Sequence, residues 1–226
     1  MPERSQARLC SARPSLYTSS MSWFHQSPEP FETKHNGTMK LSRMLGKWTL
    51  WGHDGTYQAA PYMDGVWKKT VRLLLRRDLD VRHCLVLGVA LGGTFGIVQK
   101  AWPDADIVGV DWEPALFELG KKIGIYRPDT RVNFIEGDAA EVVPALEGKF
   151  DLIIIDLFNG KKVADVVSDS AFQEAVAAHL AEDGIVAVNC YNQRPVFEGW
   201  QKRLGDSSFV RYSANEVGIF MAPKPA

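Results

Sequence analysis

After Asp80, the sequence alternates short apolar runs with longer amphipathic segments. Runs of Val, Ile and Leu are typical of strands that are buried on both faces of a parallel sheet. When strands alternate with helices, crossover connections place the helices on the two faces of that sheet. The sequence therefore predicts an α/β fold with a doubly wound, mostly parallel sheet, whose first strands lie at residues 84–87, 107–110, 132–136, 152–155 and 185–189.

The C-terminal segment SFVRYSANEVGIFMA departs from this alternation. It contains two strand-like runs separated by a short polar turn at residues 213–215. Two such runs predict a terminal antiparallel hairpin. With this hairpin, the sheet is expected to have seven strands in a Rossmann-like arrangement.

The region before Asp80 is expected to contain three parts. Residues 1–31 are expected to form a disordered extension, with an organellar transit peptide as the alternative. Residues 32–60 contain short alternating segments separated by Asn-Gly at 36–37, Gly46 and Asp-Gly at 54–55. These turn signals predict a small N-terminal antiparallel sheet of two or three strands, which must pack on the following domain to be stable. Residues 61–226 open with an amphipathic helix and form the expected Rossmann-like catalytic domain.

The composition excludes several classes of partner. The chain has 226 residues, 46% hydrophobic content and a formal net charge of −1, which gives one substantial core and no electrostatic surface for nucleic acid. No apolar run approaches the roughly 18 residues that a membrane-spanning helix needs, so no membrane partner is expected. Cys10, Cys84 and Cys190 are widely spaced, form no CxxC pair, and two of them lie inside apolar runs. This pattern is typical of buried thiols in a reducing compartment such as the cytoplasm and indicates no metal site. The seven tryptophans are interpreted as core or interface residues.

A cluster of glycines follows the first parallel strand, in LVLGVALGGTFG. Gly88, Gly92 and Gly93 allow backbone N–H groups and the positive end of the next helix to approach a ligand closely. Asp111 ends the second strand 23 residues after Gly88, where a carboxylate can accept hydrogen bonds from ribose hydroxyls. The pattern favours a nucleoside site. The alternative is structural: the glycines permit close packing, and Asp111 caps the helix that opens at Glu113.

Two further acids are expected at the same edge of the sheet. Asp138 follows the third strand, where its side chain can accept from an adenine amino group while the N–H of Ala139 meets a ring nitrogen. Asp156 follows the fourth strand, beside the switch point where open parallel sheets bind ligands. Three carboxylates around one crevice disfavour a pyrophosphate and favour a cationic sulfonium or amine.

Four segments of the catalytic domain carry a family resemblance, namely VLGVALGG, GVDWEP, EGDA and FDLIIIDLFNG. In this order they resemble the glycine motif, the ribose-binding acid segment, the adenine-contacting segment and the catalytic-aspartate strand of the spermidine synthase family. These polyamine aminopropyltransferases share the class I fold of S-adenosylmethionine-dependent methyltransferases. The resemblance implies that Asp156 is catalytic and that the donor nucleoside contacts Gly88, Gly92, Gly93, Asp111, Asp138 and Ala139.

Two N-terminal segments extend the resemblance. DGTYQ is similar to the segment whose glutamine contacts the nucleoside, which gives Gln58 that role. YMDGVWKK resembles the following tyrosine and acid motif, so Tyr62 and Asp64 are implied substrate contacts, and Asn159 is a further one. The implied reaction moves an aminopropyl group from decarboxylated S-adenosylmethionine to a small amine acceptor such as putrescine, without a metal.

The sequence also departs from the family pattern. Leu91 stands where family members carry an aspartate that pairs with the aminopropyl ammonium, and the loss of such a bond corresponds to about 1.5–3 kcal/mol of donor binding. Asn159 and Gly160 replace the second aspartate and the proline of a D-x-x-D-P stretch, and Met63 replaces a histidine. Two alternatives therefore stay open. A methyltransferase that uses intact S-adenosylmethionine is favoured by Leu91, and a non-catalytic nucleoside-binding relative is favoured by Asn159.

Asp156 is predicted to act on the acceptor amine. A neutral thioether leaves the sulfonium without help from an acid, but the attacking amine must lose its proton, which a carboxylate at a strand end can take or orient. The alternative role of Asp156 is the N-cap of whatever follows the strand. Because family relatives are commonly dimers, a homodimer through the edge of the N-terminal sheet is also a prediction.

Overall fold

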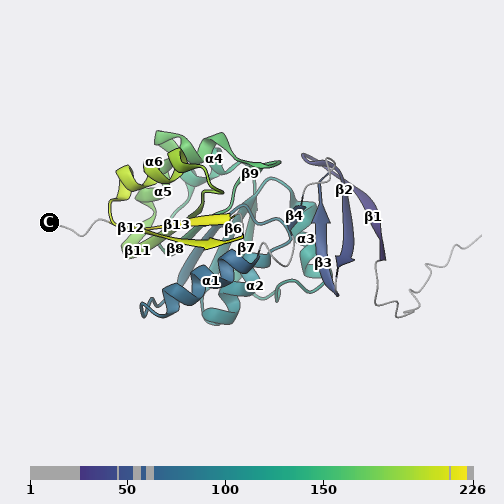
Figure 1. Cartoon of the computed structure of the whole chain (residues 1–226). Coiled ribbons are helices and arrows are strands. Elements are labelled where there is room, and N and C mark those ends of the chain that lie inside the picture. The colour runs from purple at the N-terminus through teal and green to yellow at the C-terminus, as the bar shows by residue number, and fades with distance from the viewer. Residues whose placement is uncertain (1–25, 45, 53–56, 60–63, 214, 223–226) are drawn as a thin grey trace, which may run out of the picture.

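The computed structural model describes residues 26–44, 46–52, 57–59, 64–213 and 215–222. Its large sheet contains β5 (His83–Leu87), β6 (Asp106–Asp111), β7 (Val132–Glu136), β8 (Phe150–Ile155), β11 (Leu180–Asn189), β12 (Ser207–Tyr212) and β13 (Asn215–Met221). The strand order is β12-β13-β11-β8-β5-β6-β7. Strands β5, β6, β7, β8 and β11 run parallel, and β13 pairs antiparallel with both β11 and β12 (Figure 1). The predicted seven-stranded, mostly parallel sheet with a terminal hairpin is confirmed.

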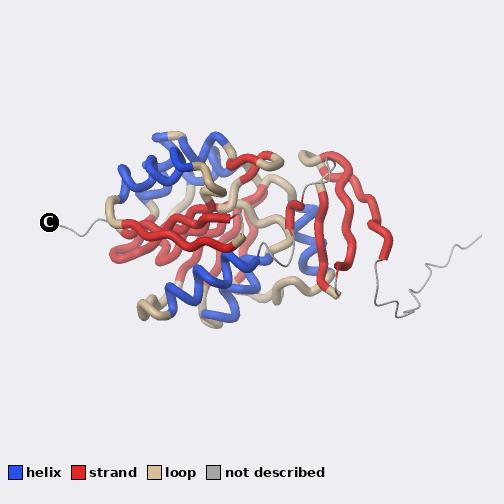
Figure 2. The backbone as a smooth tube through the Cα atoms, viewed as in Figure 1, coloured by secondary structure: helices blue, strands red, loops and turns tan. Residues whose placement is uncertain are grey.

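Helices cover both faces of this sheet (Figure 2). They are α1 (Asp64–Leu75), α2 (Gly93–Ala101), α3 (Pro114–Lys122), α4 (Ala139–Val142), α5 (Ser170–Ala178) and α6 (Arg194–Leu204), with short 3₁₀ turns η1 (Val143–Ala145) and η2 (Asp165–Ser168). One core cluster joins α1 and α2 to one face, and another joins α4, α5 and α6 to the opposite face. Because side chains alternate along a strand, Val86 belongs to the first cluster and Leu87 to the second.

The N-terminal sheet is larger than the sequence predicts. It contains β1 (Gln26–Thr33), β2 (Gly37–Met44), β3 (Lys47–Trp51) and β4 (Tyr57–Ala59), antiparallel and in that order. The predicted small antiparallel sheet is confirmed, but it has four strands where two or three were predicted, and it begins at Gln26 instead of residue 32. Strand β1 carries Pro28 and Pro30, which count against a strand in sequence analysis, but an edge strand tolerates proline because one side of it makes no ladder bonds. Residues 1–25 of the expected extension lie outside the described residues.

A small apolar cluster joins this N-terminal sheet to the main domain. Met39 and Leu50 of the sheet pack against Leu116 of α3 and against Leu91 of the glycine turn. Met39 and Leu50 are fully buried, and Leu91 is 3% exposed. This packing covers the carboxyl edge of the parallel strands with a second sheet, and it gives Leu91 a structural role that an aspartate would not fill.

Candidate nucleoside and amine site

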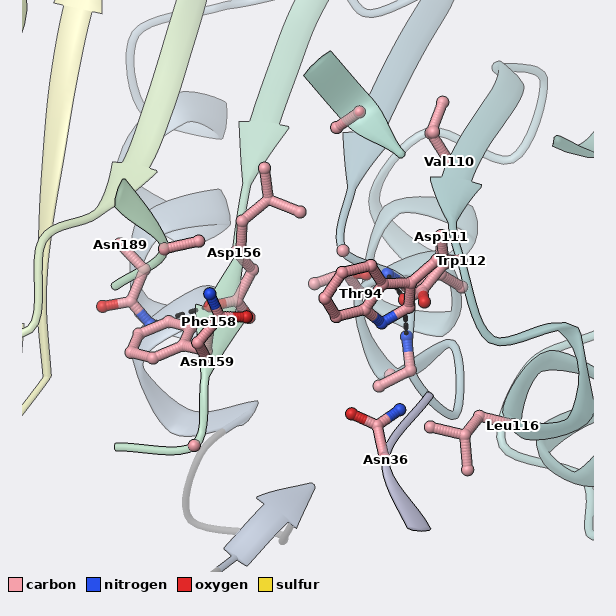
Figure 3. Close-up of a pocket in the computed structure, with 18 of the residues that line it drawn as sticks. Asn36, Thr94, Val110, Asp111, Trp112, Leu116, Asp156, Phe158, Asn159 and Asn189 are labelled. Atoms are coloured by element: carbon pink, nitrogen blue, oxygen red, sulfur yellow. Dashed lines mark hydrogen bonds between the residues drawn. The ribbon is translucent and has the colours of Figure 1, made fainter. Parts of the chain in front are cut away.

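A cavity of about 690 Å³ lies at the carboxyl ends of the parallel strands, between the two sheets. The strand order reverses between β5 and β8, so the cavity lies at the switch point where open sheets bind ligands. Figure 3 shows Asp156, Phe158 and Asn189 on one side of the cavity and Thr94, Asp111 and Trp112 on the other. Asn36 reaches the cavity from the turn between β1 and β2 (Figure 3).

The glycine turn brings the ends of β5 and β8 together. Gly88 has a φ of 87°, and a Cβ atom at this position would lie 2.3 Å from the carbonyl oxygen of Asp156. Gly88 and Gly93 both line the cavity. Gly92 is not among the residues that line the cavity. A glycine is needed there because its φ is left-handed, at 78°, and because a Cβ atom would lie 2.5 Å from the ring of Tyr126. Gly92 is therefore required by the packing of the turn.

Asp111 holds the glycine turn in shape. Its Oδ2 accepts hydrogen bonds from the N–H groups of Val89 at 2.7 Å and Ala90 at 2.9 Å, and its Oδ1 accepts from Glu113 N–H at 3.0 Å. Burial raises the pKa of Asp111, and these three N–H groups oppose the rise. The N-cap of α3 is Glu113 and not Asp111. Because a carboxylate has about four acceptor positions, Asp111 has one left for a ligand hydroxyl.

The wall next to Asp111 combines predicted and unpredicted residues. Asp138 and Ala139 both line the cavity, and Asp138 also caps α4 by accepting from Ala140 N–H at 2.9 Å. Trp112 lines the cavity too, is 37% exposed, and stacks on His35 with ring centroids 5.4 Å apart. The interpretation of every tryptophan as a core or interface residue missed Trp112. Its position directly after the strand-end acid is the signal that identifies it.

Asp156 is held by two side chains from distant parts of the chain. Trp67 Nε1–H donates to its Oδ2 at 2.8 Å, and Asn189 Nδ2–H donates to its Oδ1 at 2.9 Å. Burial raises the pKa of Asp156, the two hydrogen bonds oppose the rise, and the nearby charge of Asp64 adds to it. The N-cap alternative was wrong, since the strand is followed by a short hairpin of β9 (Phe158–Asn159) and β10 (Lys162–Val163). A carboxylate fixed in this way can accept a proton at a defined position.

Neither donor to Asp156 is among the site residues predicted from the sequence. Asn189 is the last residue of β11 and is 3% exposed, and Trp67 lies on α1 and is also 3% exposed. A polar residue that ends a buried apolar strand is a signal for Asn189. The sequence of α1 contains no equivalent signal for Trp67, because its indole fits the apolar face of an ordinary amphipathic helix.

The implied substrate contacts are described only in part. Asp64, the first residue of α1, and Asn159, on β9, both line the cavity. Gln58 lies in β4, but its side chain is outside the described residues, and so is Tyr62. The structure therefore brings Asp64 and Asn159 into the same cavity as Asp156.

The described lining of the cavity is strongly acidic. It contains one lysine, Lys161, and five aspartates, namely Asp64, Asp111, Asp138, Asp156 and Asp165. An excess of carboxylates concentrates cations and repels phosphates. Within the described residues, no cluster of three or more His, Cys, Asp or Glu side chains is placed to hold a metal ion, and no helix is long and apolar enough to span a membrane.

The fold and the cavity together define a Rossmann-like, class I methyltransferase type of domain with an acidic ligand site. No protein-family model matches the chain. The chain is 25% identical over 127 residues to a polyamine aminopropyltransferase of Chromobacterium violaceum, and the aligned region covers 55% of this chain and 48% of that protein. It is 23% identical over 148 residues to the polyamine aminopropyltransferase of Neisseria meningitidis serogroup A, which covers 65% and 52%. The chain thus spans about half the length of the curated relatives it matches.

Solved structures agree with this assignment of the fold. A probable spermidine synthase from Corynebacterium glutamicum superimposes with a TM-score of 0.72 at 16% identity, over 87% of this chain and 80% of that chain. A spermidine synthase in complex with the transition-state analogue AdoDATO gives 0.60 at 15% identity, over 88% and 69%. Human methyltransferase-like protein 13 in complex with SAH gives 0.59 at 15% identity, over 74% and 86%. The fold of this chain is spermidine synthase-like.

Proposed function

We propose that this protein is a spermidine synthase-like transferase. It moves an aminopropyl group from decarboxylated S-adenosylmethionine to a small amine acceptor such as putrescine. The observation that carries the proposal is the Asp156 carboxylate at the switch point, oriented by Trp67 and Asn189 in an acidic cavity. The similarity to polyamine aminopropyltransferases supports the same reaction class.

The residues of the cavity fit an adenosyl donor. Gly88 and Gly93 leave room on the wall of the cavity, and Asp111 retains one acceptor position for a ribose hydroxyl. Asp138 and the N–H of Ala139 are the proposed adenine contacts, and Trp112 offers an aromatic face beside them. Gln58 is the proposed nucleoside contact from the N-terminal sheet.

The chemistry of this chain consists of positioning and proton removal. The acceptor nitrogen forms a bond to the donor's propyl carbon while the carbon–sulfur bond breaks. The electron pair of the broken bond stays on sulfur, which gives neutral methylthioadenosine. The proton of the amine passes to Asp156 and then to water. Because burial raises the pKa of Asp156, this carboxylate is a stronger base than an exposed aspartate, and a base in this position contributes about 10²–10⁴ in rate. Asn159 and Tyr62 are the proposed acceptor contacts.

Transfer of a methyl group from intact S-adenosylmethionine is the second candidate function. Leu91 favours it, because an uncharged residue in the glycine turn does not repel a donor that keeps its carboxylate. The same fold also occurs in a methyltransferase-like protein that was solved with SAH.

Binding and turnover distinguish these candidates. We expect isothermal titration to rank decarboxylated S-adenosylmethionine above both S-adenosylmethionine and methylthioadenosine. Asp156→Asn should lower aminopropyl transfer by about 10²–10⁴ and leave donor binding intact. Asp106→Asn is the matched control, since Asp106 is exposed at the opposite end of β6. Preference for the intact donor would contradict aminopropyl transfer, and unchanged turnover in Asp156→Asn would remove Asp156 from its role.

A further inference from the structure

The acids of the cavity differ in how fully the protein itself uses them. Asp111 accepts three backbone N–H groups, and Asp156 accepts two side-chain donors. Among the described residues, Lys68 is the one hydrogen-bond and ion-pair partner of Asp64, at 3.4 Å, and the two side chains are 47% and 36% exposed. The charge of Lys47 also acts on Asp64 and lowers its pKa. Asp64 therefore keeps most of its capacity to bind a cation from the cavity.

Asp64 also lies at the glycine turn. Its Oδ1 is 2.8 Å from where a Cβ atom on Gly93 would be, so this oxygen rests against the first residue of α2. Leu91, which stands where the family has its ammonium-binding aspartate, lies two residues earlier in the same turn and is buried under the N-terminal sheet. A carboxylate is thus present at this turn, although it comes from α1.

Thr94 supplies an independent indication that a ligand binds here. It lines the cavity and follows Gly93 in the first turn of α2, and it is only 7% exposed. Its Oγ1 has no hydrogen-bond partner among the residues that the structure describes. A buried hydroxyl without a partner is destabilising, and an ammonium, which has three N–H donors and no acceptor, can satisfy its oxygen.

We infer that Asp64 is the counter-ion of the donor's terminal ammonium and that Thr94 Oγ1 accepts a second hydrogen bond from it. This inference rests on the proposed donor class. It moves Asp64 from the acceptor side, where the sequence resemblance places a substrate contact, to the donor side. It also explains how the chain retains an ammonium site without an aspartate at Leu91.

An ammonium bound at the start of α2 needs a carboxylate beside it. The N-terminus of a helix carries partial positive charge, which disfavours an ammonium unless a carboxylate lies beside it. Burial raises the pKa of Asp64, and Lys68 and the charge of Lys47 oppose the rise. A bound ammonium stabilises the same ionised form. The competing structural role is that Asp64 serves only as the anion for α2 and for Lys68.

Two adenosyl thioethers that are uncharged at sulfur and differ only in the terminal amine, which is protonated at neutral pH, test the inference. 5′-Deoxy-5′-(3-aminopropylthio)adenosine carries the terminal amine, and 5′-propylthioadenosine lacks it. In titration calorimetry, we expect the wild-type protein to bind the amine-bearing compound about 10- to 100-fold more tightly than the amine-free one. We expect Asp64→Asn to remove most of this ratio of the two affinities. Asp165→Asn, a charge-matched change at an exposed aspartate of the same cavity, should keep the ratio.

Several outcomes would overturn the inference. If Asp64→Asn only lowers the melting temperature and keeps the ratio, Asp64 acts as the anion for α2. If Asp165→Asn lowers the ratio equally, the overall potential of the cavity binds the amine. Thr94→Val should raise the melting temperature of the ligand-free protein and lower the ratio several-fold; an unchanged ratio would exclude the hydroxyl as a contact. If the wild-type protein binds the amine-bearing compound more tightly but shows no aminopropyl turnover, only the proposed function is contradicted. If the protein turns over and Asp64→Asn keeps the ratio of the two affinities, only the inference is contradicted.

Discussion

Trp67→Phe removes one hydrogen bond to Asp156 and keeps most of the packing at a position that is 3% exposed. The lost bond runs from Nε1–H to Asp156 Oδ2 at 2.8 Å. This bond stabilises the ionised carboxylate and thereby lowers the pKa of Asp156. Removing the bond should therefore raise the pKa of Asp156. Because the proposed base is the ionised form, the acid limb of the pH–rate profile should move to higher pH.

The size of the effect follows from the type of bond. A hydrogen bond to a charged group contributes about 1.5–3 kcal/mol, and each 1.4 kcal/mol corresponds to about a tenfold change in an equilibrium. At a pH below the limb, kcat/KM for aminopropyl transfer should therefore fall about 10- to 100-fold. Above the limb, the two enzymes should approach the same rate, because Asp156 is then ionised in both.

The assay is a profile of kcat/KM from about pH 5 to pH 9, with donor affinity measured separately by titration. Trp200→Phe is the matched control, since Trp200 is fully buried and its Nε1–H donates at 3.1 Å to the carbonyl of Val167, away from Asp156. A limb that stays in place in Trp67→Phe, or that moves equally in Trp200→Phe, would refute the assignment of Asp156 as the titrating base.

Two further substitutions test how the site is built. Gly88→Ala forces a side chain into a left-handed conformation and against the carbonyl oxygen of Asp156. It should lower activity, and it should lower the free energy of unfolding by more than about 1 kcal/mol. The control is Gly148→Ala, at a φ of 92° with open space around it, which should lower stability in denaturant melts and keep activity. In Asp111→Asn, the amide offers one acceptor oxygen to three N–H groups. The substitution should lower the free energy of unfolding by about 1–3 kcal/mol and weaken methylthioadenosine binding in titrations. Unchanged values in both measurements would contradict the role of Asp111 in holding the glycine turn and binding the nucleoside.

The sequence by itself determined the main sheet and the position of its acids. The parallel strands are continuous apolar runs, and the terminal hairpin is a pair of strand-like runs around a polar turn, so both are local patterns. Because parallel strands end at one edge of a sheet, the residues that follow them, Asp111, Asp138 and Asp156, line one cavity once the fold is known. The glycine pattern identified the turn in the same way, but it could not separate Gly88, which lines the cavity, from Gly92, which packs on Tyr126.

Only the tertiary structure decided what surrounds those acids. Trp67 and Asp156 are 89 residues apart in the chain, and Asn189 is 33 residues from Asp156. Leu91 reads as the loss of a charge in the sequence, whereas in the fold it joins the two sheets and Asp64 lies at the same turn. Strands and turns follow from neighbouring residues, whose pattern is local. The partners of a buried carboxylate come from distant elements that meet only when helices pack on the sheet, so a local pattern can mark Asn189 as a polar strand end but cannot pair it, or Trp67, with Asp156.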